Sequence, residues 1–501
     1  MNKYMIYCIL CFFLVTAATS CEPEAGKPGT VVTIGTDGYW YLDGVKSEYR
    51  AEGSTISIGT DGYWYIDGVK TEYRAEGSTI SIGTDGHWYI NGTKTRYLAG
   101  VYSIPDEDRI VVAKFFSRGD ADWMQERVEW AQQLGVNQLL MFPDQVLREG
   151  VADVLSNSGI ELWLIAPFFY NDDNQTPGQI ADFGRTPRWG ICDDGEPAWE
   201  VYSPNSHPSG SWLRFVCPND QEYIDYRINS LKPALRACNF TGLSLDFMRQ
   251  FIYWEGTYSY TNPNSLRNAC FCEECVQKFA DIYGHTPENP SSVPSADRIS
   301  NSESNNNLLD RFLALINARV LLVQEDVEGS NAQAIKEKTI EIADFVKENL
   351  FRQWTNFKCA TVDENVEYIL AEMRSEFPDL KSNIHAVPFT SNSYNGAVRS
   401  IAGQDFALLS RQLDMISPMT YDRLCMRPAH WINEITADIV NVVGGRIPVV
   451  PTIEGRGDTD SDYETSLINA LKPPSSGVVI WRFESLTPER IEITDRILNK
   501  K

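Results

Sequence analysis

Two carboxylates stand where apolar, strand-like runs of the sequence end. Asp246 closes the run Leu-Ser-Leu, and Glu454 closes the run Pro-Thr-Ile. A pair of carboxyl groups cleaves a glycosidic bond when one protonates the leaving oxygen and the other attacks the sugar or activates water. Asp246 and Glu454 are the two candidates for this chemistry, with Glu255 as a further catalytic candidate. The alternatives are a salt bridge from Asp246 to Arg249, a solvated loop position for Glu454 and a scaffolding role for Glu255.

Aromatic and polar side chains accompany these carboxylates at the ends of the same runs. Aromatic faces stack on pyranose rings, so these residues fit the binding of a sugar. The residues expected to hold it are Arg249, Trp254, Tyr421, Asp422 and Trp481. The alternative is that Tyr421, Asp422 and Trp481 only pack or form hydrogen bonds at the rim of the fold.

After residue 106, eight β-rich runs alternate with amphipathic stretches. The expected strands are 110–116, 137–142, 161–168, 242–247, 382–389, 415–420, 448–453 and 478–483, and helical stretches between them include 122–134, 223–236, 275–283, 364–377 and 462–471. This order predicts an α/β fold, a (β/α)8 TIM barrel over residues 106–501, whose active site lies at the C-terminal ends of the strands. A doubly wound open sheet is the alternative, but no Gly-rich phosphate loop follows the first strand. Two insertions, 171–220 and 287–351, are expected to form lids or subsites.

Three cysteines form the cluster Cys270-Phe-Cys272-Glu-Glu-Cys275, and Cys192 and Cys217 lie in the long insertion before it. Three closely spaced thiolates can bind one metal ion, and a tetrahedral zinc site then needs a fourth ligand, for which we favour Cys217 with Cys192 as substitute. Disulfides are the alternative in an exported protein, and free buried thiols are another. No organic cofactor is expected.

The cysteine segment, continued by Val-Gln-Lys-Phe and by Tyr283-Gly284, is similar to the zinc-cluster segment of family 42 β-galactosidases. The resemblance implies that Cys270, Cys272 and Cys275 are zinc ligands of a structural site.

The same resemblance extends to the carboxylates. In family 42 the catalytic acid ends strand four and the nucleophile ends strand seven, which are the positions of Asp246 and Glu454. The chain departs from that clan by having Leu245-Asp246 where the clan has Asn-Glu. It also resembles family 18 chitinases, more weakly, through Met-Thr-Tyr421-Asp422 and Trp481.

The N-terminal segment reads as a lipoprotein signal peptide over residues 1–20. Lys3 precedes an apolar run that is too short to span a bilayer, and small residues then lead to Cys21. This pattern resembles a bacterial lipobox, which implies acylation of Cys21 and attachment to the outer membrane or cell surface. Ordinary cleavage beside a bystander cysteine is the alternative.

After a linker over residues 21–30, one unit occurs three times within residues 31–100, at a period of 24 residues. Asp-Gly pairs between β-branched and aromatic residues predict short β-hairpins, so a small all-β repeat region precedes the barrel. The repeats resemble spacers of Bacteroidetes surface proteins. Trp40, Trp64 and Trp88 either form the repeat core or offer stacking platforms for sugars.

The net charge of the chain limits the classes of molecule that it is expected to bind. There are 68 acidic and 44 basic residues, for a formal charge of −24. Because nucleic acids are bound by neutralising their phosphates with Lys and Arg, this balance argues against a nucleic-acid partner. The expected partners are a glycan substrate and a membrane reached through the lipid anchor. The alternative to hydrolysis is a glycan-binding lipoprotein with a degenerate barrel.

Overall fold

A computed structural model describes residues 32–34, 39–42, 45–50, 56–58, 63–66, 69–74, 80–82, 87–91, 93–98, 109–171, 183–200, 213–252, 254, 266–284, 299, 307–456 and 459–499. The chain divides into two compact units, Met1–Ser103 and Ile104–Lys501. The predicted signal peptide, Cys21, the linker over residues 21–30 and Glu255 lie outside the described residues. Among the helices of the described residues, none is long and apolar enough to cross a membrane.

The larger unit contains eight parallel strands in the order β18-β17-β16-β12-β11-β10-β20-β19. Their bounds are β10 (Ile110–Lys114), β11 (Gln138–Met141), β12 (Glu161–Pro167), β16 (Gly242–Asp246), β17 (Lys381–Ala386), β18 (Met415–Pro418), β19 (Thr452–Glu454) and β20 (Gly477–Trp481). A parallel bridge between Ile416 and Val449 joins the two ends of this sheet. The sheet is therefore a closed TIM-like barrel, and all eight strands overlap the runs predicted from the sequence.

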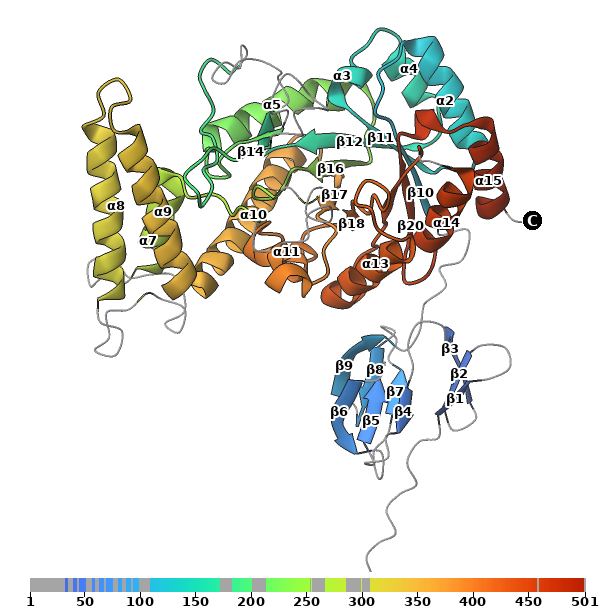
Figure 1. Ribbon diagram of the computed structural model, residues 1–501. Coiled ribbons are helices and arrows are strands. Elements are labelled where there is room, and N and C mark those ends of the chain that lie inside the picture. Colours follow the sequence, from blue (N-terminus) through green and yellow to red (C-terminus); the bar gives the residue numbers. More distant parts are fainter. Residues whose placement is uncertain are drawn as a thin grey trace, which may run out of the picture. The chain divides into compact units, whose positions relative to one another are not determined.

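Most helices of this unit lie around the sheet, and those between residues 273 and 349 lie to one side of it (Figure 1). The helices are α2 (Ala121–Gln133), α3 (Pro143–Val146), α4 (Val151–Ser156), α5 (Gln221–Ala237), α7 (Glu273–Tyr283), α8 (Leu308–Gln324), α9 (Ala332–Asn349), α10 (Phe351–Arg374), α11 (Ala397–Ser400), α12 (Phe406–Leu409), α13 (His430–Val443), α14 (Asp460–Ala470) and α15 (Pro488–Leu498). Side chains cap several helix starts, because the first turn leaves backbone N–H groups without partners. Asp120 accepts a hydrogen bond from the N–H of Trp123, and Thr459 accepts one from Asp462.

The period-two alternation of each strand decides which side chains face the barrel axis. One layer of the interior is an apolar cluster that includes Val112, Trp163, Met415 and Val479. Two residues further along β10 is Lys114, which the same alternation turns inward. The floor of the barrel is thus apolar, and the polar groups collect toward the C-terminal ends of the strands.

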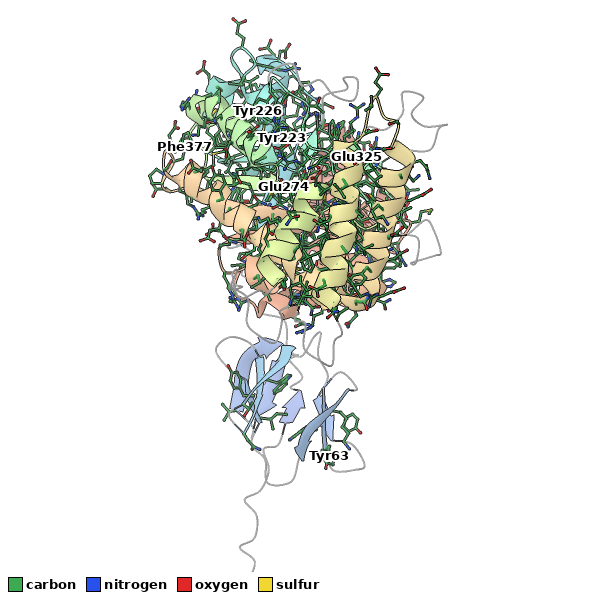
Figure 2. The ribbon with its side chains drawn as sticks, turned by 90° about the vertical axis from the view of Figure 1, so that its left-hand side faces the viewer. Tyr63, Tyr223, Tyr226, Glu274, Glu325 and Phe377 are labelled. Carbon is green, nitrogen blue, oxygen red and sulfur yellow. The ribbon has the colours of Figure 1, made fainter. Side chains whose placement is uncertain are left out.

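The two predicted insertions form separate structures beside the barrel. The first contains a small antiparallel sheet in the order β13 (Tyr170–Asn171), β15 (Leu213–Phe215) and β14 (Trp199–Glu200). The second contains α8 and α9, which pack side by side, with α7 against α8 (Figure 2). Buried aromatic residues of α7, α8 and α10, including Phe279, Phe312 and Trp354, join these helices into one apolar cluster. That cluster also contains the cysteines of the first insertion.

Each N-terminal repeat forms a three-stranded antiparallel sheet, where the sequence had predicted a two-stranded hairpin. The strands are β1 (Val32–Ile34), β2 (Tyr39–Leu42), β3 (Val45–Arg50), β4 (Ile56–Ile58), β5 (Tyr63–Ile66), β6 (Val69–Arg74), β7 (Ile80–Ile82), β8 (His87–Ile90) and β9 (Thr93–Leu98). The extra strand arises because the second turn of each unit, Asp-Gly in the first two units and Asn-Gly in the third, also separates two paired strands, as the pairing of Leu42 with Val45 shows. Trp64 and Trp88 are buried, which fits their interpretation as the repeat core.

Candidate active site and metal centre

A buried ion pair lies between the first and fourth strands of the barrel. The Nζ of Lys114, at the end of β10, lies 3.7 Å from Oδ2 of Asp246, at the end of β16. The backbone N–H of Phe247 donates a further hydrogen bond to Oδ1 of Asp246, at 2.9 Å. The sequence had offered Arg249 as a partner for Asp246, whereas the structure pairs Asp246 with Lys114.

A polar network continues this ion pair through the barrel interior. The Nε2 of His385, on β17, lies 3.4 Å from Lys114 Nζ and 3.0 Å from Ser244 Oγ. Asn383 donates a hydrogen bond to Ser244 Oγ at 2.8 Å and accepts one from Ser417 at 3.1 Å. The network fixes the side chains around Asp246 from three neighbouring strands, β16, β17 and β18.

The charges around Asp246 keep it ionised. Burial acts to raise the pKa of its carboxyl group, but His385 in its protonated form, Lys114, the backbone N–H of Phe247 and Arg249 together leave the pKa below its ordinary value. Since His385 is protonated only at low pH, Lys114, the N–H of Phe247 and Arg249 are the stabilising contacts that remain at neutral pH. Burial lowers the pKa of Lys114 and lowers that of His385 to about 3. At neutral pH His385 is therefore a neutral imidazole, and Asp246 is a carboxylate facing the Lys114 amine.

Glu454 and Asp422 have the opposite character. Glu454, at the end of β19, is 9 % exposed, and burial raises its pKa above the ordinary value against the effect of Arg456, whose Nε is 3.7 Å away. Burial also raises the pKa of Asp422, whose Oδ2 accepts a 2.8 Å hydrogen bond from Ser466. The negative charge of Asp422 raises the pKa of Glu454 further. The environment of the barrel mouth thus lowers the pKa of Asp246 and raises the pKa values of Glu454 and Asp422.

Three of the predicted sugar-binding aromatics lie together. The ring centroids of Tyr421 and Trp481 are 4.6 Å apart, and those of Trp254 and Tyr421 are 5.7 Å apart. Trp481 is the register partner of Glu454 across β19 and β20, so the aromatic group adjoins that carboxyl. Trp254 is almost wholly buried, and Trp481 and the neighbouring Phe116 are the partly exposed members.

Arg249 is placed differently from the other predicted sugar ligands. It is buried, its guanidinium lies over the rings of Phe215 and Phe247, and Nη1 donates to the carbonyl of Ile252 at 3.0 Å. These contacts give Arg249 a role in holding the loop after β16.

Two non-glycine residues adopt left-handed backbone conformations directly after predicted site residues. Phe247 follows Asp246 with φ 53°, and Arg482 follows Trp481 with φ 58°. Side chains other than glycine disfavour this region, and such strain persists where surrounding structure enforces it, often at functional sites. The strained positions mark the ends of β16 and β20 as the rim of the candidate site.

The four predicted metal ligands come together beside the barrel. The sulfur atoms of Cys217, Cys270, Cys272 and Cys275 all lie within 4.8 Å of one another, and all four residues are buried. Cys217 Sγ is 3.4 Å from the sulfurs of both Cys272 and Cys275. Zn–S bonds of about 2.3 Å in a tetrahedron imply S···S separations of about 3.8 Å, so the spacing is close to that of a zinc site. Cys192, the substitute ligand, is outside this group, and all eight cysteines of the described residues are free thiols.

Neighbouring donors also fit a thiolate–metal centre. The backbone N–H of Asn219 donates a hydrogen bond to Cys217 Sγ at 3.4 Å, and its side-chain amide donates one to Cys275 Sγ at 3.2 Å. The Nζ of Lys278 donates a hydrogen bond to Oδ1 of the same amide at 2.9 Å. Burial and the crowding of neighbouring thiols raise the pKa of Cys217 well above its ordinary value. Without a metal ion these conditions favour the protonated thiol of Cys217, whereas a bound cation would favour the thiolate, and the N–H···S donors match the outer partners that orient metal ligands.

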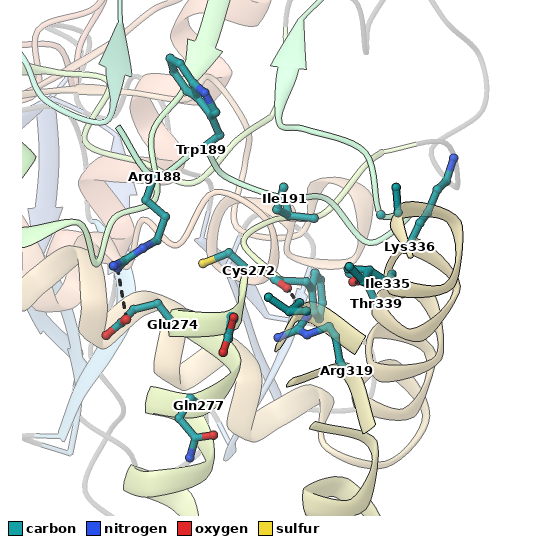
Figure 3. Close-up of a pocket in the computed structure, with 15 residues that line it drawn as sticks. Arg188, Trp189, Ile191, Cys272, Glu274, Gln277, Arg319, Ile335, Lys336 and Thr339 are labelled. Atoms are coloured by element: carbon teal, nitrogen blue, oxygen red, sulfur yellow. Dashed lines mark hydrogen bonds and ion pairs between the residues drawn. The ribbon is translucent and has the colours of Figure 1, made fainter. Parts of the chain in front are cut away.

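Arg319, on α8, supplies a positive charge beside this centre. It is 3 % exposed, and Nη1 donates to the carbonyl of Phe271 at 2.7 Å, between two of the cysteines. Its Nε and Nη2 are buried and have no hydrogen-bond partner among the described residues. A guanidinium buried in this way fits the net negative charge that four thiolates keep after binding a divalent ion. Cys272 and Arg319 also line a cavity of about 700 Å³ between α7, α8, α9 and the first insertion (Figure 3).

Lys114 and His385 are candidate site residues that the sequence analysis missed. Lys114 ends the apolar strand β10, and His385 lies near the end of β17, where barrel active sites gather. A charged residue inside an apolar run was the available signal. Lys114 and Asp246 are far apart in the sequence, so no local sequence pattern indicates that they form an ion pair.

The comparisons with known proteins give information on the fold alone. No protein-family model matches the sequence, and no curated protein matches it. Among solved structures, the PgaB (BpsB) glycoside hydrolase domain from Bordetella bronchiseptica matches 78 % of this chain and 98 % of its own, with 11 % identity and a TM-score of 0.46. The β-amylase catalytic domain from Paenibacillus polymyxa matches 78 % and 98 %, with 10 % identity and a TM-score of 0.45.

Gan42B, a GH42 β-galactosidase from G. stearothermophilus, matches 78 % of this chain at 11 % identity with a TM-score of 0.42. The chain spans 57 % of the length of that protein. The barrel is therefore distantly similar to glycoside hydrolase TIM-barrel domains, and at these scores the likeness assigns neither an activity nor a site residue.

Proposed function

We propose that the protein is a glycoside hydrolase that acts on a polysaccharide or oligosaccharide by a two-carboxylate mechanism. The observation that carries the proposal is the contrast between Asp246 and Glu454. One carboxyl group is held ionised beside Lys114, and the other is buried with a raised pKa. Two titratable groups whose environments push their pKa values apart are the arrangement that divides acid and base roles in such enzymes.

The electrostatics support an exchange of the roles expected from the sequence. Glu454, with its raised pKa, is suited to protonate the leaving glycosidic oxygen. Asp246, kept ionised by Lys114, is suited to attack the sugar or to activate water. Lys114 and His385 act as positioning residues for Asp246, and Asp422 sustains the raised pKa of Glu454. The Tyr421–Trp481 pair supplies an aromatic face for a sugar ring.

A zinc ion is proposed for the four-cysteine cluster, held by Cys217, Cys270, Cys272 and Cys275. Four thiolates leave no open coordination position for substrate or water, so the ion would supply structural cross-linking. The cluster connects the first insertion, through Cys217, to the start of α7. Arg319 connects α8 to the same place through its hydrogen bond to the carbonyl of Phe271. The chemistry of cleavage is left to the barrel carboxylates.

The proposal includes attachment at the outer membrane or cell surface through acylated Cys21. Its support is the lipobox-like sequence before Cys21 and the spacer-like repeats that follow. This placement would bring the barrel to extracellular glycans and away from nucleic acids.

The test is a screen of released reducing sugar across a panel of polysaccharides, using the full chain and a Glu454→Gln variant in parallel. Hydrolysis by the wild type that falls by several orders of magnitude in the variant supports the proposal. Glycan binding by affinity electrophoresis without any hydrolysis would instead favour the second candidate, a non-catalytic glycan-binding protein. The observation that favours this candidate is the engagement of Asp246 in an ion pair.

A further inference from the structure

Arginines gather at the barrel mouth of a chain that is strongly acidic as a whole. The formal charge is −24, yet Arg423, Arg456 and Arg482 follow the ends of β18, β19 and β20, and all three act electrostatically on Glu454. Arg423 is committed to Asp462, at 2.9 Å. Arg456 pairs with Glu454 at 3.7 Å, and within the described residues Arg482 forms no ion pair.

Arg482 is held in an unusual position. Its backbone has φ 58°, its guanidinium lies 4.2 Å from the ring centroid of Phe116 and 4.7 Å from that of Trp481, and its Nε is buried with no hydrogen-bond partner. The nearby carboxylate of Glu484 is occupied by the backbone N–H groups of Phe116 and Ser117, the latter at 2.8 Å. Within the described residues Arg482 forms no ion pair, so its guanidinium, held against two aromatic rings, has charge and donors available for an anion.

Arg456 approaches the same place from the next strand. The loops after β19 and β20 are in contact, because the N–H of Gly455 donates to the carbonyl of Trp481 at 2.6 Å. A side chain at Gly455 would collide with the carbonyl of Arg482, so this approach needs glycine. The two guanidinium groups repel each other across this contact, since the charge of Arg456 acts to lower the pKa of Arg482. Glu454 offsets part of this repulsion because it attracts both guanidinium groups, and a bound anion would offset more of it.

We propose that the barrel mouth recognises an anionic sugar unit, bearing a carboxylate or a sulfate, with Arg482 and Arg456 as its charge partners and Phe116 and Trp481 as the stacking surface. Arginine suits this task because its planar fork binds carboxylate or sulfate oxygens through paired hydrogen bonds while its face stacks on aromatic rings. The facing acidic groups are Glu454, which pairs with Arg456, Asp422, which accepts a hydrogen bond from Ser466, and Glu484, which accepts hydrogen bonds from backbone N–H groups. The inference rests on the proposed function in taking the barrel mouth as the glycan site.

The experiment measures binding by isothermal titration calorimetry in a Glu454→Gln background, so that no cleavage occurs. The probes are a defined oligogalacturonate, a sulfated galacto-oligosaccharide and a neutral galacto-oligosaccharide, each titrated at low and high salt. Arg482→Gln is the test variant, Arg482→Lys keeps charge without the fork, and Arg496→Gln on α15 is the exposed control. Circular dichroism and thermal unfolding establish that each variant is folded.

We expect an anionic probe to bind in a salt-dependent manner and Arg482→Gln to weaken it about tenfold or more, as for a lost charge-assisted hydrogen bond, with partial retention in Arg482→Lys. The uronate and sulfate arms identify which anion is preferred. Equal binding of the neutral probe, or an unchanged preference in folded Arg482→Gln and Arg456→Gln variants, overturns the inference. If the wild type cleaves only neutral glycans, the hydrolase proposal stands and the anion inference fails. If binding depends on Arg482 but the wild type cleaves nothing, the anion inference stands and the hydrolase proposal fails.

Discussion

Lys114 Nζ lies 3.7 Å from Oδ2 of Asp246, although β10 and β16 are separated in the sheet by β11 and β12. The ion pair therefore crosses the barrel interior, with side chains only 4 % and 13 % exposed. At such depth the desolvation of both charges is costly, and removal of one partner leaves the other charge buried and uncompensated. The arrangement favours a functional reason for keeping the pair.

The Lys114→Met variant tests this relationship. We expect it to lower the free energy of unfolding by about 3–5 kcal/mol, because Asp246 loses its ion-pair partner. The double variant Lys114→Met with Asp246→Asn should recover much of that loss, since no unpaired carboxylate is left. Chemical denaturation provides the measurement, with the exposed pair variant Arg496→Gln changing stability by less than about 1 kcal/mol as control. A Lys114→Met protein as stable as the wild type would contradict the buried ion pair.

The pH dependence of hydrolysis should report the two carboxyl groups. Activity requires Asp246 ionised, so the rate should fall as pH drops through a pKa below the ordinary value for Asp. It also requires Glu454 protonated, so the rate should fall as pH rises through a pKa above the ordinary value for Glu. The profile of kcat/KM is then bell-shaped. An alkaline limb that persists in whatever activity Glu454→Gln retains would rule out Glu454 as the acid.

Asp422→Asn should move the alkaline limb to lower pH. The negative charge of Asp422 helps to raise the pKa of Glu454, and its removal makes Glu454 ionise more readily. Loss of the Ser466 hydrogen bond partner would by itself lower activity or stability without moving the limb. Ser466→Ala is the matched control, and an unmoved limb in Asp422→Asn argues against electrostatic coupling to Glu454.

Purified protein should contain one zinc ion per chain, bound by the four buried thiolates. Metal analysis, together with intact mass for disulfides, checks this expectation. Cys217→Ser should lower the thermal stability more than it changes any pH–rate profile, because the proposed zinc site is structural and takes no part in cleavage. Arg319→Met should weaken zinc retention against a chelator, since it removes the positive charge beside the thiolates. Disulfide-linked protein without zinc would reverse the assignment.

Bacterial expression with labelled fatty acid should give a labelled protein, and Cys21→Ala should abolish the label. The reason is that Cys21 follows small residues at the end of the apolar run. Gel fluorography of the two proteins, at matched expression, makes the measurement. Label that persists in the variant would remove the lipoprotein assignment.

The sequence by itself determined the barrel, because eight apolar runs in alternation with amphipathic stretches have few ways to bury their surfaces. It also located Asp246, Glu454, Tyr421 and Trp481, since strand ends on one face of a barrel gather at one mouth. The close cysteine spacing supplied three ligands of the candidate metal centre on one helix start. These predictions depend on local pattern and on the symmetry of the fold.

Only the tertiary structure decided the partners of these groups. Lys114 reaches Asp246 and His385 because the closed sheet brings inward-facing side chains of distant strands to the same height, which no local spacing encodes. The tertiary structure also decided between the two candidates for the fourth ligand, because the folded chain brings Cys217 to the cluster and leaves Cys192 outside it. The exchange of acid and base roles between Asp246 and Glu454 follows from those neighbours, since burial and nearby charge set a pKa and both are properties of the folded chain.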